Sequence, residues 1–508
     1  MSRLLLSSCL ALVAMSATGS AENEDHGLPQ TDGATKTWKG YPVYGTTHQY
    51  VALPDPPKAI ARTAAEPQIS PYIYLNRCTG GCLIKGAAEG QRDDARQNIS
   101  FIATPGDHLV SEFKNKAGQT GAAADAEWNQ IVKCMKEVYS PFGVMLTDQK
   151  PVGVSYTMAV IAGTPQEIEY DPMAAGVAPA GCDPQDNVIS FSFANYDNAA
   201  DRVNSICWTA AQETAHAFGL DHEYQFSDGT SACNDPMTYR YDCGGQKFFR
   251  NKAAQCGENS ARTCRCGGSQ NSHIKIRSVF GDGTSLIPAP TCVVTNPTSG
   301  SVNNGAVITA TSGSQRGVAR VELWLNNYKW TDVPGAKFGL TGQANPSTYS
   351  LTFPGNVPDG KIDMVVKCFD DLGLEKDSQM ITVQKGNCND AASCKCLAGQ
   401  QFADGKCFWE APVGELGDDC TFPQYCKTGI CTETDQGAFC SSDCIIGSSD
   451  GCPMSFECIQ TGAATGQCLP VSEGGCCSAS TGANQVWAQM GLGGLILGFI
   501  VRRRRRRR

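Results

Sequence analysis

The distribution of its 27 cysteines constrains this chain more than any other feature of its 508 residues. Twelve cysteines fall within residues 388–468, a density at which a hydrophobic core cannot be the main source of stability. Ten more lie within residues 78–266, and Cys292 and Cys368 stand between the two blocks. The even number in each block favours pairing within blocks, as in an exported, oxidised protein. We therefore predict disulfides in residues 388–468 rather than thiolate metal sites.

The N-terminal segment also predicts export. Arg3 precedes an apolar run over Leu4–Ala17, and the small residues that follow end at Ala21. This order is typical of a secretory signal peptide, so we expect residues 1–21 to be removed.

The charge balance excludes one class of partner. The formal net charge is −9, with 41 basic and 50 acidic residues. Eight of the basic residues are Arg3 and the terminal run Arg502–Arg508, so the body of the protein is strongly acidic. A surface of this kind does not neutralise phosphates, and we expect no nucleic-acid partner.

The C-terminus predicts a membrane anchor. Val486–Val501 is an almost uncharged apolar stretch that spans about 24 Å as a helix, and flanking residues and snorkelling arginines lengthen it enough to cross a bilayer. Arg502–Arg508 would remain on the cytoplasmic side, with the body of the protein outside.

A short motif precedes this stretch. Gly474 to Cys477, a spacer of small residues, the apolar stretch and the arginine run together resemble the MYXO-CTERM sorting tail of myxobacterial surface proteins. The resemblance implies that a sortase-like membrane protease cuts near Cys476 or Cys477. It also implies delivery to the cell surface or outer membrane, where the protein stays anchored or is released.

Changes in composition and in the spacing of apolar residues divide the rest of the chain into regions. Residues 22–68 are polar and interrupted by prolines, which indicates a linker or a pro-segment. Strand and helix patterns then alternate, with helices expected at 125–140 and 201–218 and strands at 72–75, 144–146, 156–161 and 188–193. Short strands follow at 307–311, 318–325, 348–353 and 364–369, and their turns suit an immunoglobulin-like sandwich in which Cys292 and Cys368 form one bridge.

These patterns predict a multidomain protein. The expected order is a signal peptide (1–21), a linker or pro-segment (22–68), an α/β (α+β) domain (69–288), an all-β Ig-like sandwich (289–386), a disulfide-rich EGF-like or stalk region (387–470), and a tail (471–508) with a transmembrane helix over 486–501.

One segment of the second expected helix carries candidate chemistry. Gln212 and His216 are four residues apart and share a helix face, and Glu213 lies beside that face. Gly219 permits a sharp turn after the helix, so that His222 can return as a third ligand. Three protein ligands with one open position, next to a carboxylate that takes a proton from water, are what a catalytic zinc site requires.

This segment resembles the metzincin zinc-protease signature, H-E-x-x-H-x-x-G-x-x-H followed by a methionine turn. Glu213, His216, Gly219 and His222 stand at matching positions, and Met237 in Asp235-Pro236-Met237 resembles the Met-turn. The resemblance implies Zn²⁺, Glu213 as general base, and Tyr239 as an extra ligand or transition-state helper. It also suggests a myxobacterial family of surface metalloproteases.

The first ligand position departs from the signature, because Gln212 stands where histidine is expected. A carboxamide oxygen can coordinate zinc, but it is a weaker donor than imidazole. Either Gln212, His216 and His222 still hold zinc, or the site is a relic in a domain that only binds.

The functional prediction is a surface-anchored zinc metalloendopeptidase that hydrolyses extracellular proteins or peptides. The alternative is a catalytically inactive metzincin-like scaffold that serves in adhesion or binding at the cell surface. The four other histidines, His26, His48, His108 and His273, have no metal-like spacing and are expected at the surface, with His108 a remote substitute for the missing ligand. Cys78 and Cys82 are expected to form a local disulfide rather than a zinc-blocking thiolate.

Overall fold

The computed structural model describes residues 33–55, 69–240, 243–335, 345–435, 437–445, 452–453, 455–460 and 465–471. The predicted signal peptide, the transmembrane stretch 486–501, and Cys476 and Cys477 lie outside these residues. Within the described ranges no helix is long and apolar enough to cross a bilayer. The described residues fall into two compact units: one runs up to Cys396 and includes Phe402–Cys407, and the other comprises Leu397–Gln401 and the described residues from Phe408 onward.

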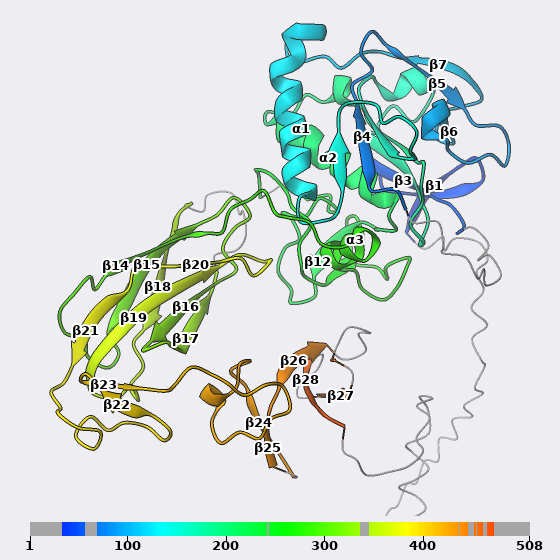
Figure 1. The fold of residues 1–508 in the computed structure, drawn as a ribbon. Coiled ribbons are helices and arrows are strands. Elements are labelled where there is room, and N and C mark those ends of the chain that lie inside the picture. The colour runs from blue at the N-terminus through cyan, green and yellow to red at the C-terminus, as the bar shows by residue number, and fades with distance from the viewer. Residues whose placement is uncertain are drawn as a thin grey trace, which may run out of the picture. The chain divides into compact units, whose positions relative to one another are not determined.

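An eight-stranded mixed sheet is the centre of the N-terminal half (Figure 1). Its order is β1 (Ala34–Trp38), β2 (Tyr41–Tyr44), β3 (His48–Ala52), β10 (Gly176–Ala180), β11 (Ile189–Ser192), β9 (Thr157–Ile161), β4 (Tyr72–Asn76) and β8 (Met145–Thr147). The strands from β11 to β8 pair in parallel, whereas β10 is antiparallel to β11. The strands predicted from residues 72 to 193 are therefore confirmed within one or two residues.

Two long helices pack beside each other in this half, as Figure 1 shows. They are α1 (Asp125–Tyr139) and α2 (Arg202–His216), and both match the predicted helices closely. The Cys134–Cys207 disulfide joins them, and α2 packs against β3, β9, β10 and β11 of the sheet. The buried face of α2 is rich in alanine, which allows this close approach of helix and sheet.

Smaller elements complete this half. A third helix, α3 (Ser272–Phe280), begins at Asn271, whose side chain accepts a hydrogen bond from the backbone N–H of Ile274. The short strands are β5 (Cys82–Gly86), β6 (Ile99–Ser100), β7 (Gly106–Val110), β12 (Glu223–Phe226) and β13 (Ala254–Cys256). The local Cys78–Cys82 disulfide is present as predicted.

The N-terminal strands correct the expectation for residues 22–68. Residues 34–52 are not a linker, because they form β1, β2 and β3 and extend the central sheet. Strand β3 pairs in parallel with β10 over five residue pairs, and all five of its residues are buried. The pairing partner lies more than 120 residues away, so no local pattern in the sequence reports it.

A two-sheet sandwich follows, as predicted. One sheet contains β14 (Thr291–Asn296), β15 (Val307–Gly313) and β18 (Ser347–Thr352). The other contains β16 (Arg320–Leu325), β17 (Tyr328–Pro334), β19 (Gly360–Phe369), β20 (Glu375–Asp377) and β21 (Ile381–Lys385). The inward side chains form a separate hydrophobic core, which includes the predicted Cys292–Cys368 disulfide.

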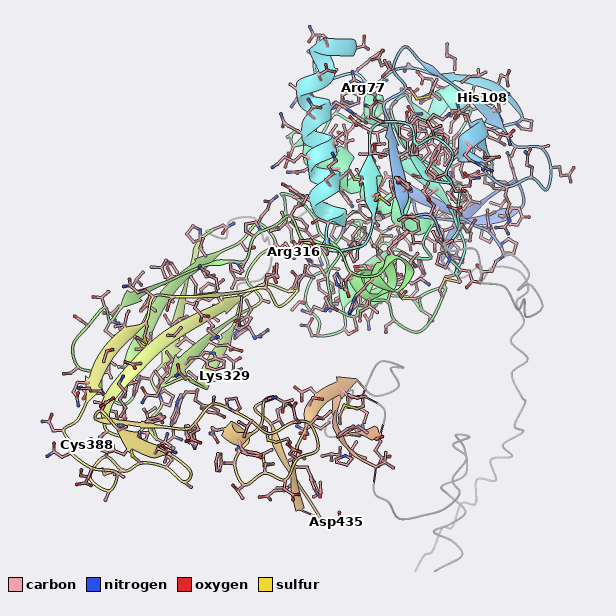
Figure 2. The ribbon with its side chains drawn as sticks, in the orientation of Figure 1. Arg77, His108, Arg316, Lys329, Cys388 and Asp435 are labelled. Carbon is pink, nitrogen blue, oxygen red and sulfur yellow. A yellow bond between two sulfur atoms is a disulfide. The ribbon has the colours of Figure 1, made fainter. Side chains whose placement is uncertain are left out.

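The cysteine-rich region is divided between the two units, which the sequence did not indicate. Its first part holds β22 (Gln401–Ala403), β23 (Lys406–Phe408) and the disulfides Cys388–Cys394 and Cys396–Cys407. Cys388 is labelled in Figure 2. This part hydrogen-bonds to the sandwich, for example from the Asp359 N–H to the Cys394 carbonyl (2.8 Å). Disulfides therefore close every described cysteine pair here, which confirms oxidation over thiolate sites.

The second unit is built from short hairpins. It contains β24 (Cys431–Thr434), β25 (Gly437–Cys440), β26 (Ser442–Ile445), β27 (Phe456–Gln460) and β28 (Thr465–Pro470). Its disulfides are Cys420–Cys431, Cys426–Cys440, Cys444–Cys458 and Cys452–Cys468. Its one described apolar cluster consists mainly of half-cystines, so covalent links provide most of the stability, as predicted.

Candidate metal centre

Helix α2 places the first three candidate residues at its C-terminal end. Gln212, Glu213 and His216 are all fully buried. The helix ends at His216, and Gly219 then adopts a positive φ of +87°. A side chain at Gly219 would place its Cβ 2.4 Å from the Cys182 carbonyl oxygen, so only glycine fits this turn.

The turn brings the two candidate histidines together. His216 Nε2 and His222 Nε2 are 3.1 Å apart, and their rings meet nearly perpendicularly. Two imidazoles that bind one tetrahedral zinc at 2.0–2.1 Å would have nitrogens about 3.3 Å apart. The distance between the two Nε2 atoms therefore fits two ligands of one zinc ion.

Hydrogen bonds to the other ring nitrogens decide which nitrogen carries the proton. His216 Nδ1 donates to the Leu220 carbonyl oxygen (2.8 Å), which can only accept. His222 Nδ1 donates to Glu258 Oε1 (2.8 Å). Although burial opposes it, hydrogen bonds from His222 and Arg262 lower the pKa of Glu258 to about 2, so this carboxylate is an acceptor.

When both rings are neutral, the two Nε2 atoms present lone pairs to each other. A neutral ring whose proton is on Nδ1 cannot donate from Nε2, and burial lowers the pKa of His216 well below its usual value. Two facing lone pairs repel each other, whereas a cation between them would satisfy both. A ligand histidine held through its other nitrogen by a carbonyl or carboxylate is the usual arrangement at protein metal sites.

The buried side chains of Gln212 and Glu213 also lack hydrogen-bond partners. Neither side-chain atom of the Gln212 amide and neither carboxylate oxygen of Glu213 has a hydrogen-bond partner. Unpartnered polar groups of this kind cost several kcal/mol to bury, roughly 1–3 each from mutational data. Burial raises the pKa of Glu213 well above its usual value. The two imidazole nitrogens fit a zinc ion by their separation, and Gln212, one turn before His216 on α2, carries an amide oxygen of a kind that can coordinate zinc.

Met237 and Tyr239 also reach this region. Met237 is fully buried, and its carbonyl accepts a hydrogen bond from the Glu223 N–H (2.8 Å), directly after His222. The Tyr239 ring lies 4.9 Å from the His222 ring, centre to centre. The Tyr239 hydroxyl, however, accepts hydrogen bonds from the Thr46 N–H (2.8 Å) and the His48 N–H (3.1 Å) and donates to the His48 carbonyl.

The surface prediction for the other histidines is wrong at the three that the structure describes, and His26 lies outside the described residues. His48, His108 and His273 are buried rather than at the surface. His108 lies on β7, where it is labelled in Figure 2, and its Nε2 donates to the Thr104 carbonyl (2.8 Å). Among the described residues His108 contacts Thr104 and neither His216 nor His222, so it does not replace the missing ligand.

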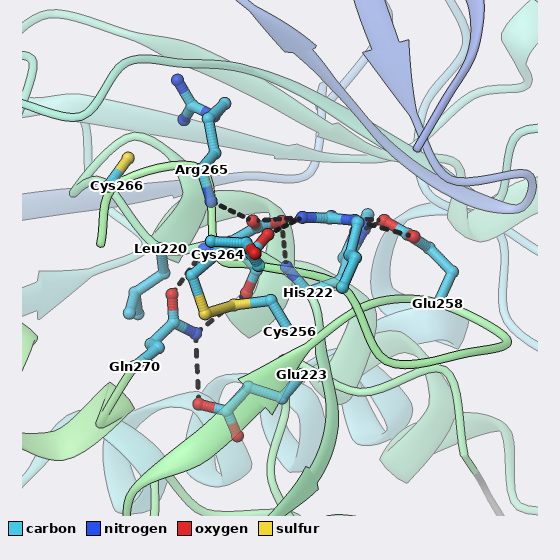
Figure 3. Close-up of a disulfide and its surroundings, with 12 residues drawn as sticks. Leu220, His222, Glu223, Cys256, Glu258, Cys264, Arg265, Cys266 and Gln270 are labelled. Atoms are coloured by element: carbon cyan, nitrogen blue, oxygen red, sulfur yellow. Dashed lines mark hydrogen bonds and ion pairs between the residues drawn. A yellow bond between two sulfur atoms is a disulfide. The ribbon is translucent and has the colours of Figure 1, made fainter. Parts of the chain in front are cut away.

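Several residues that support the site were missed. Figure 3 shows Glu258 reaching the His222 ring from the loop that the Cys256–Cys264 disulfide closes. Arg262 in the same loop donates to Asp221 (2.6 Å) and to Glu258 (2.8 Å). The only signal for this loop in the sequence is the close spacing of its cysteines, which does not reveal what the loop contacts.

Three groups of side chains in the described part have the proximity of metal ligands. Two of them, Cys420–Cys426–Cys431 and Cys444–Cys452–Cys468, consist of cysteines already closed in disulfides. The third is Asp221, His222 and Glu258, but Arg262 already neutralises both carboxylates. We therefore assign this third group to the support of His222 rather than to a separate cation site.

Comparison with known proteins adds little. No family model and no curated protein matches the chain. Among solved structures it is similar to the fibronectin(III)-like modules of Clostridium thermocellum CbhA, at 16% identity, covering 19% of this chain and 94% of that chain. The TM-score of 0.14 is too low for this similarity to carry an argument.

Proposed function

We propose that this protein is a zinc metalloendopeptidase of the metzincin type. The observation that carries the proposal is the pair of His216 and His222 Nε2 atoms, 3.1 Å apart, with both Nδ1 atoms anchored. His216, His222 and the Gln212 amide oxygen would hold Zn²⁺, which would supply Lewis-acid activation of water and of the scissile carbonyl.

Glu213 is the proposed general base. It follows Gln212 on α2, and a Cβ built on Gly176 of β10 would lie 2.6 Å from its Oε1. Its carboxylate therefore lies between α2 and β10. With a cation nearby the Glu213 carboxylate would ionise, take the proton of the attacking water, and pass it to the leaving amine.

The proposed substrates are extracellular proteins or peptides, and the location rests on the two ends of the chain. The signal peptide would export the protein, and a sortase-like protease would act near Cys476 or Cys477 to place it at the cell surface. The disulfides of both units support an oxidising environment.

One observation favours the inactive scaffold as a second candidate. Gln212 replaces an imidazole by a weaker donor, and a scaffold needs no metal. The unpartnered atoms of Gln212 and Glu213 support the enzyme instead, because an apolar pair would bury at lower cost in a site without function.

A comparison of the wild type with Glu213→Gln tests the proposal. Both full-length proteins should bind one zinc ion, because Glu213 is not a ligand. Hydrolysis of a peptide library, followed by mass spectrometry, should fall at least 100-fold in Glu213→Gln, the usual loss for a missing general base. Equal hydrolysis by both proteins, or a wild type that binds no zinc, would contradict the proposal.

A further inference from the structure

Two loops of the sandwich contribute buried charged side chains that contact the α/β half. The loop between β15 and β16 carries Arg316, which is labelled in Figure 2, and the loop between β19 and β20 carries Asp371. The Arg316 side chain is fully buried, although it belongs to a connection between strands. Arginine is almost never buried to this extent unless its charge is paired.

Asp371 is the partner of Arg316 within the sandwich. Arg316 Nε donates to Asp371 Oδ1 and Arg316 Nη2 donates to Asp371 Oδ2, both at 2.8 Å, so the planar guanidinium and the carboxylate form two parallel hydrogen bonds. Although burial opposes it, nearby Arg250 and Arg316 lower the pKa of Asp371 below its usual value. The Asp371 carboxylate is therefore ionised.

Arg250 of the α/β half completes this group, and the three side chains are here called the buried ion cluster. Arg250 Nη1 donates to the Arg316 carbonyl oxygen (2.6 Å) and lies 3.4 Å from Asp371 Oδ2. Arg316 Nη2 in turn donates to the Phe249 carbonyl oxygen (3.0 Å). Two guanidiniums, one from the sandwich and one from the α/β half, thus share the Asp371 carboxylate. Loss of this carboxylate would leave two buried cations facing each other.

The backbone of Arg250 continues the connection to residues 235–237, here called the Met237 turn. The Arg250 N–H donates to Asp235 Oδ2 (2.8 Å), and the Met237 N–H donates to Asp235 Oδ1 (2.9 Å). Asp235 is fully buried, so water does not compete for these bonds. One carboxylate therefore ties the backbone at Arg250 to the backbone at Met237.

The Met237 turn is bonded to both segments that carry candidate zinc ligands. The Pro236 carbonyl oxygen accepts a hydrogen bond from Trp208 Nε1 of α2, the helix that presents two of the ligands (2.7 Å). The Met237 carbonyl oxygen accepts a hydrogen bond from the Glu223 N–H (2.8 Å), directly after His222. A shift of this turn would therefore reach the backbone on both sides of the site.

We propose that Arg316 and Asp371 of the sandwich are positioning residues for the zinc site, which they support through Arg250 and the Met237 turn. This inference rests on the proposed function, because it concerns the same site. The sandwich would then be more than a spacer between the α/β half and the disulfide-rich region. The coupling runs through the buried ion cluster, so a sandwich that is less stable but still folded should leave the site unchanged.

The test compares Asp371→Asn with Glu322→Gln in the full-length, zinc-loaded protein. Glu322 is also a buried carboxylate of the sandwich, but its partners Arg320, Trp324 and Lys329 all belong to the sandwich. At a temperature at which calorimetry shows every protein folded, Asp371→Asn should release zinc to a chromophoric chelator at least tenfold faster than the wild type. Glu322→Gln should release zinc at the wild-type rate, even where its sandwich is less stable.

A spectrum of the metal separates positioning from a general loss of stability. Co²⁺ bound in place of Zn²⁺ absorbs visible light in bands that depend on the geometry of its ligands. These bands should shift in Asp371→Asn and stay in place in Glu322→Gln. A residue that only stabilises the fold would leave the spectrum of the folded protein unchanged.

A second variant keeps the test decisive if Asp371→Asn does not fold. Arg316→Lys retains a cation opposite Asp371 but loses the pair of parallel hydrogen bonds, so it should accelerate zinc release by a smaller factor. Wild-type release rates and Co²⁺ spectra in the folded Asp371 and Arg316 variants would overturn the positioning role and leave the peptidase intact. Equal acceleration in Glu322→Gln would also overturn it. A wild type that binds no metal would overturn the peptidase, and the positioning role with it.

Discussion

At the scale of single residues, the site combines strong support with one weak ligand. His216 and His222 are both held through Nδ1, by the Leu220 carbonyl and by Glu258. Gln212 has no such support, since neither of its side-chain atoms is bonded. The two imidazoles should therefore supply most of the zinc affinity. The weaker donation of the Gln212 amide oxygen should limit how tightly the site binds zinc.

Gln212→His should tighten zinc binding by tenfold or more. Imidazole is a better donor than an amide oxygen, and α2 already presents this position one turn before His216. Hydrolysis need not rise in step, because a better donor also makes zinc a weaker Lewis acid. Competition with a chelator of known affinity measures the change, with the exposed Gln149→His as control. Unchanged affinity would remove Gln212 from the ligand set.

His273 should make the stability of the protein depend on pH. Burial, together with nearby Arg316, lowers the pKa of His273 to about 4. In the unfolded chain the pKa is about 6.5, so between pH 6.5 and pH 4 the unfolded state binds a proton that the folded state does not. The stabilising effect of a neutral His273 is therefore present above pH 6.5 and is lost as the pH falls.

The non-titrating variant His273→Gln measures this effect. Between pH 7 and pH 5 the wild type should lose about 1 kcal/mol of unfolding free energy relative to the variant, allowing for solvent screening. Denaturation in urea at both pH values gives the difference. A constant difference between the two proteins would show that His273 has an ordinary pKa.

At the scale of elements, α2 is the part of the fold on which the site depends. It carries three of the candidate residues, and its main covalent tie is the Cys134–Cys207 disulfide to α1. This link closes a loop of sequence separation 73. A bridge of that length stabilises a domain by about 4 kcal/mol in the chain-entropy account.

Replacing both Cys134 and Cys207 by alanine should lower the thermal midpoint of the domain and weaken zinc binding. The matched control replaces Cys292 and Cys368, a disulfide of sequence separation 76 in the sandwich. That control should destabilise the sandwich but leave zinc affinity unchanged. Calorimetry and chelator competition separate the two effects. Equal losses of zinc affinity in both double variants would contradict the role assigned to α2.

The same elements show which parts of the fold could be predicted from the sequence and which could not. The apolar spacing of α1 and α2 predicts both helices within two residues of their ends, because each buries one continuous face. Strand β3 was missed because its burial comes from pairing with β10, far along the chain. Glu258 was missed for the same reason, since a disulfide loop brings it to His222.

At the scale of the whole molecule, the source of stability changes along the chain, from large hydrophobic cores to disulfides near the C-terminal end of the described residues. The α/β half and the sandwich each have an extended hydrophobic core, whereas the second unit depends on its disulfides. Disulfides therefore hold together the region that the sequence predicts as a stalk. The proposed sorting tail lies outside the described residues.

Cleavage of the C-terminal tail can be tested on the mature protein. If residues 471–508 act as a sorting signal, the mature protein should end near Cys476 or Cys477. Intact-mass measurement on protein from the native cell surface should then show the loss of both Arg502–Arg508 and residues 1–21. Recovery of a mass that includes the seven arginines would exclude cleavage of the anchor.

The most direct test of the zinc site is anomalous diffraction at the zinc absorption edge, from crystals of the full-length protein. We predict one peak between His216 Nε2 and His222 Nε2, about 2.0–2.1 Å from each, with the Gln212 amide oxygen as a further ligand. Zinc-supplemented crystals with no peak there, or with zinc only beside Asp221 and Glu258, would contradict the account.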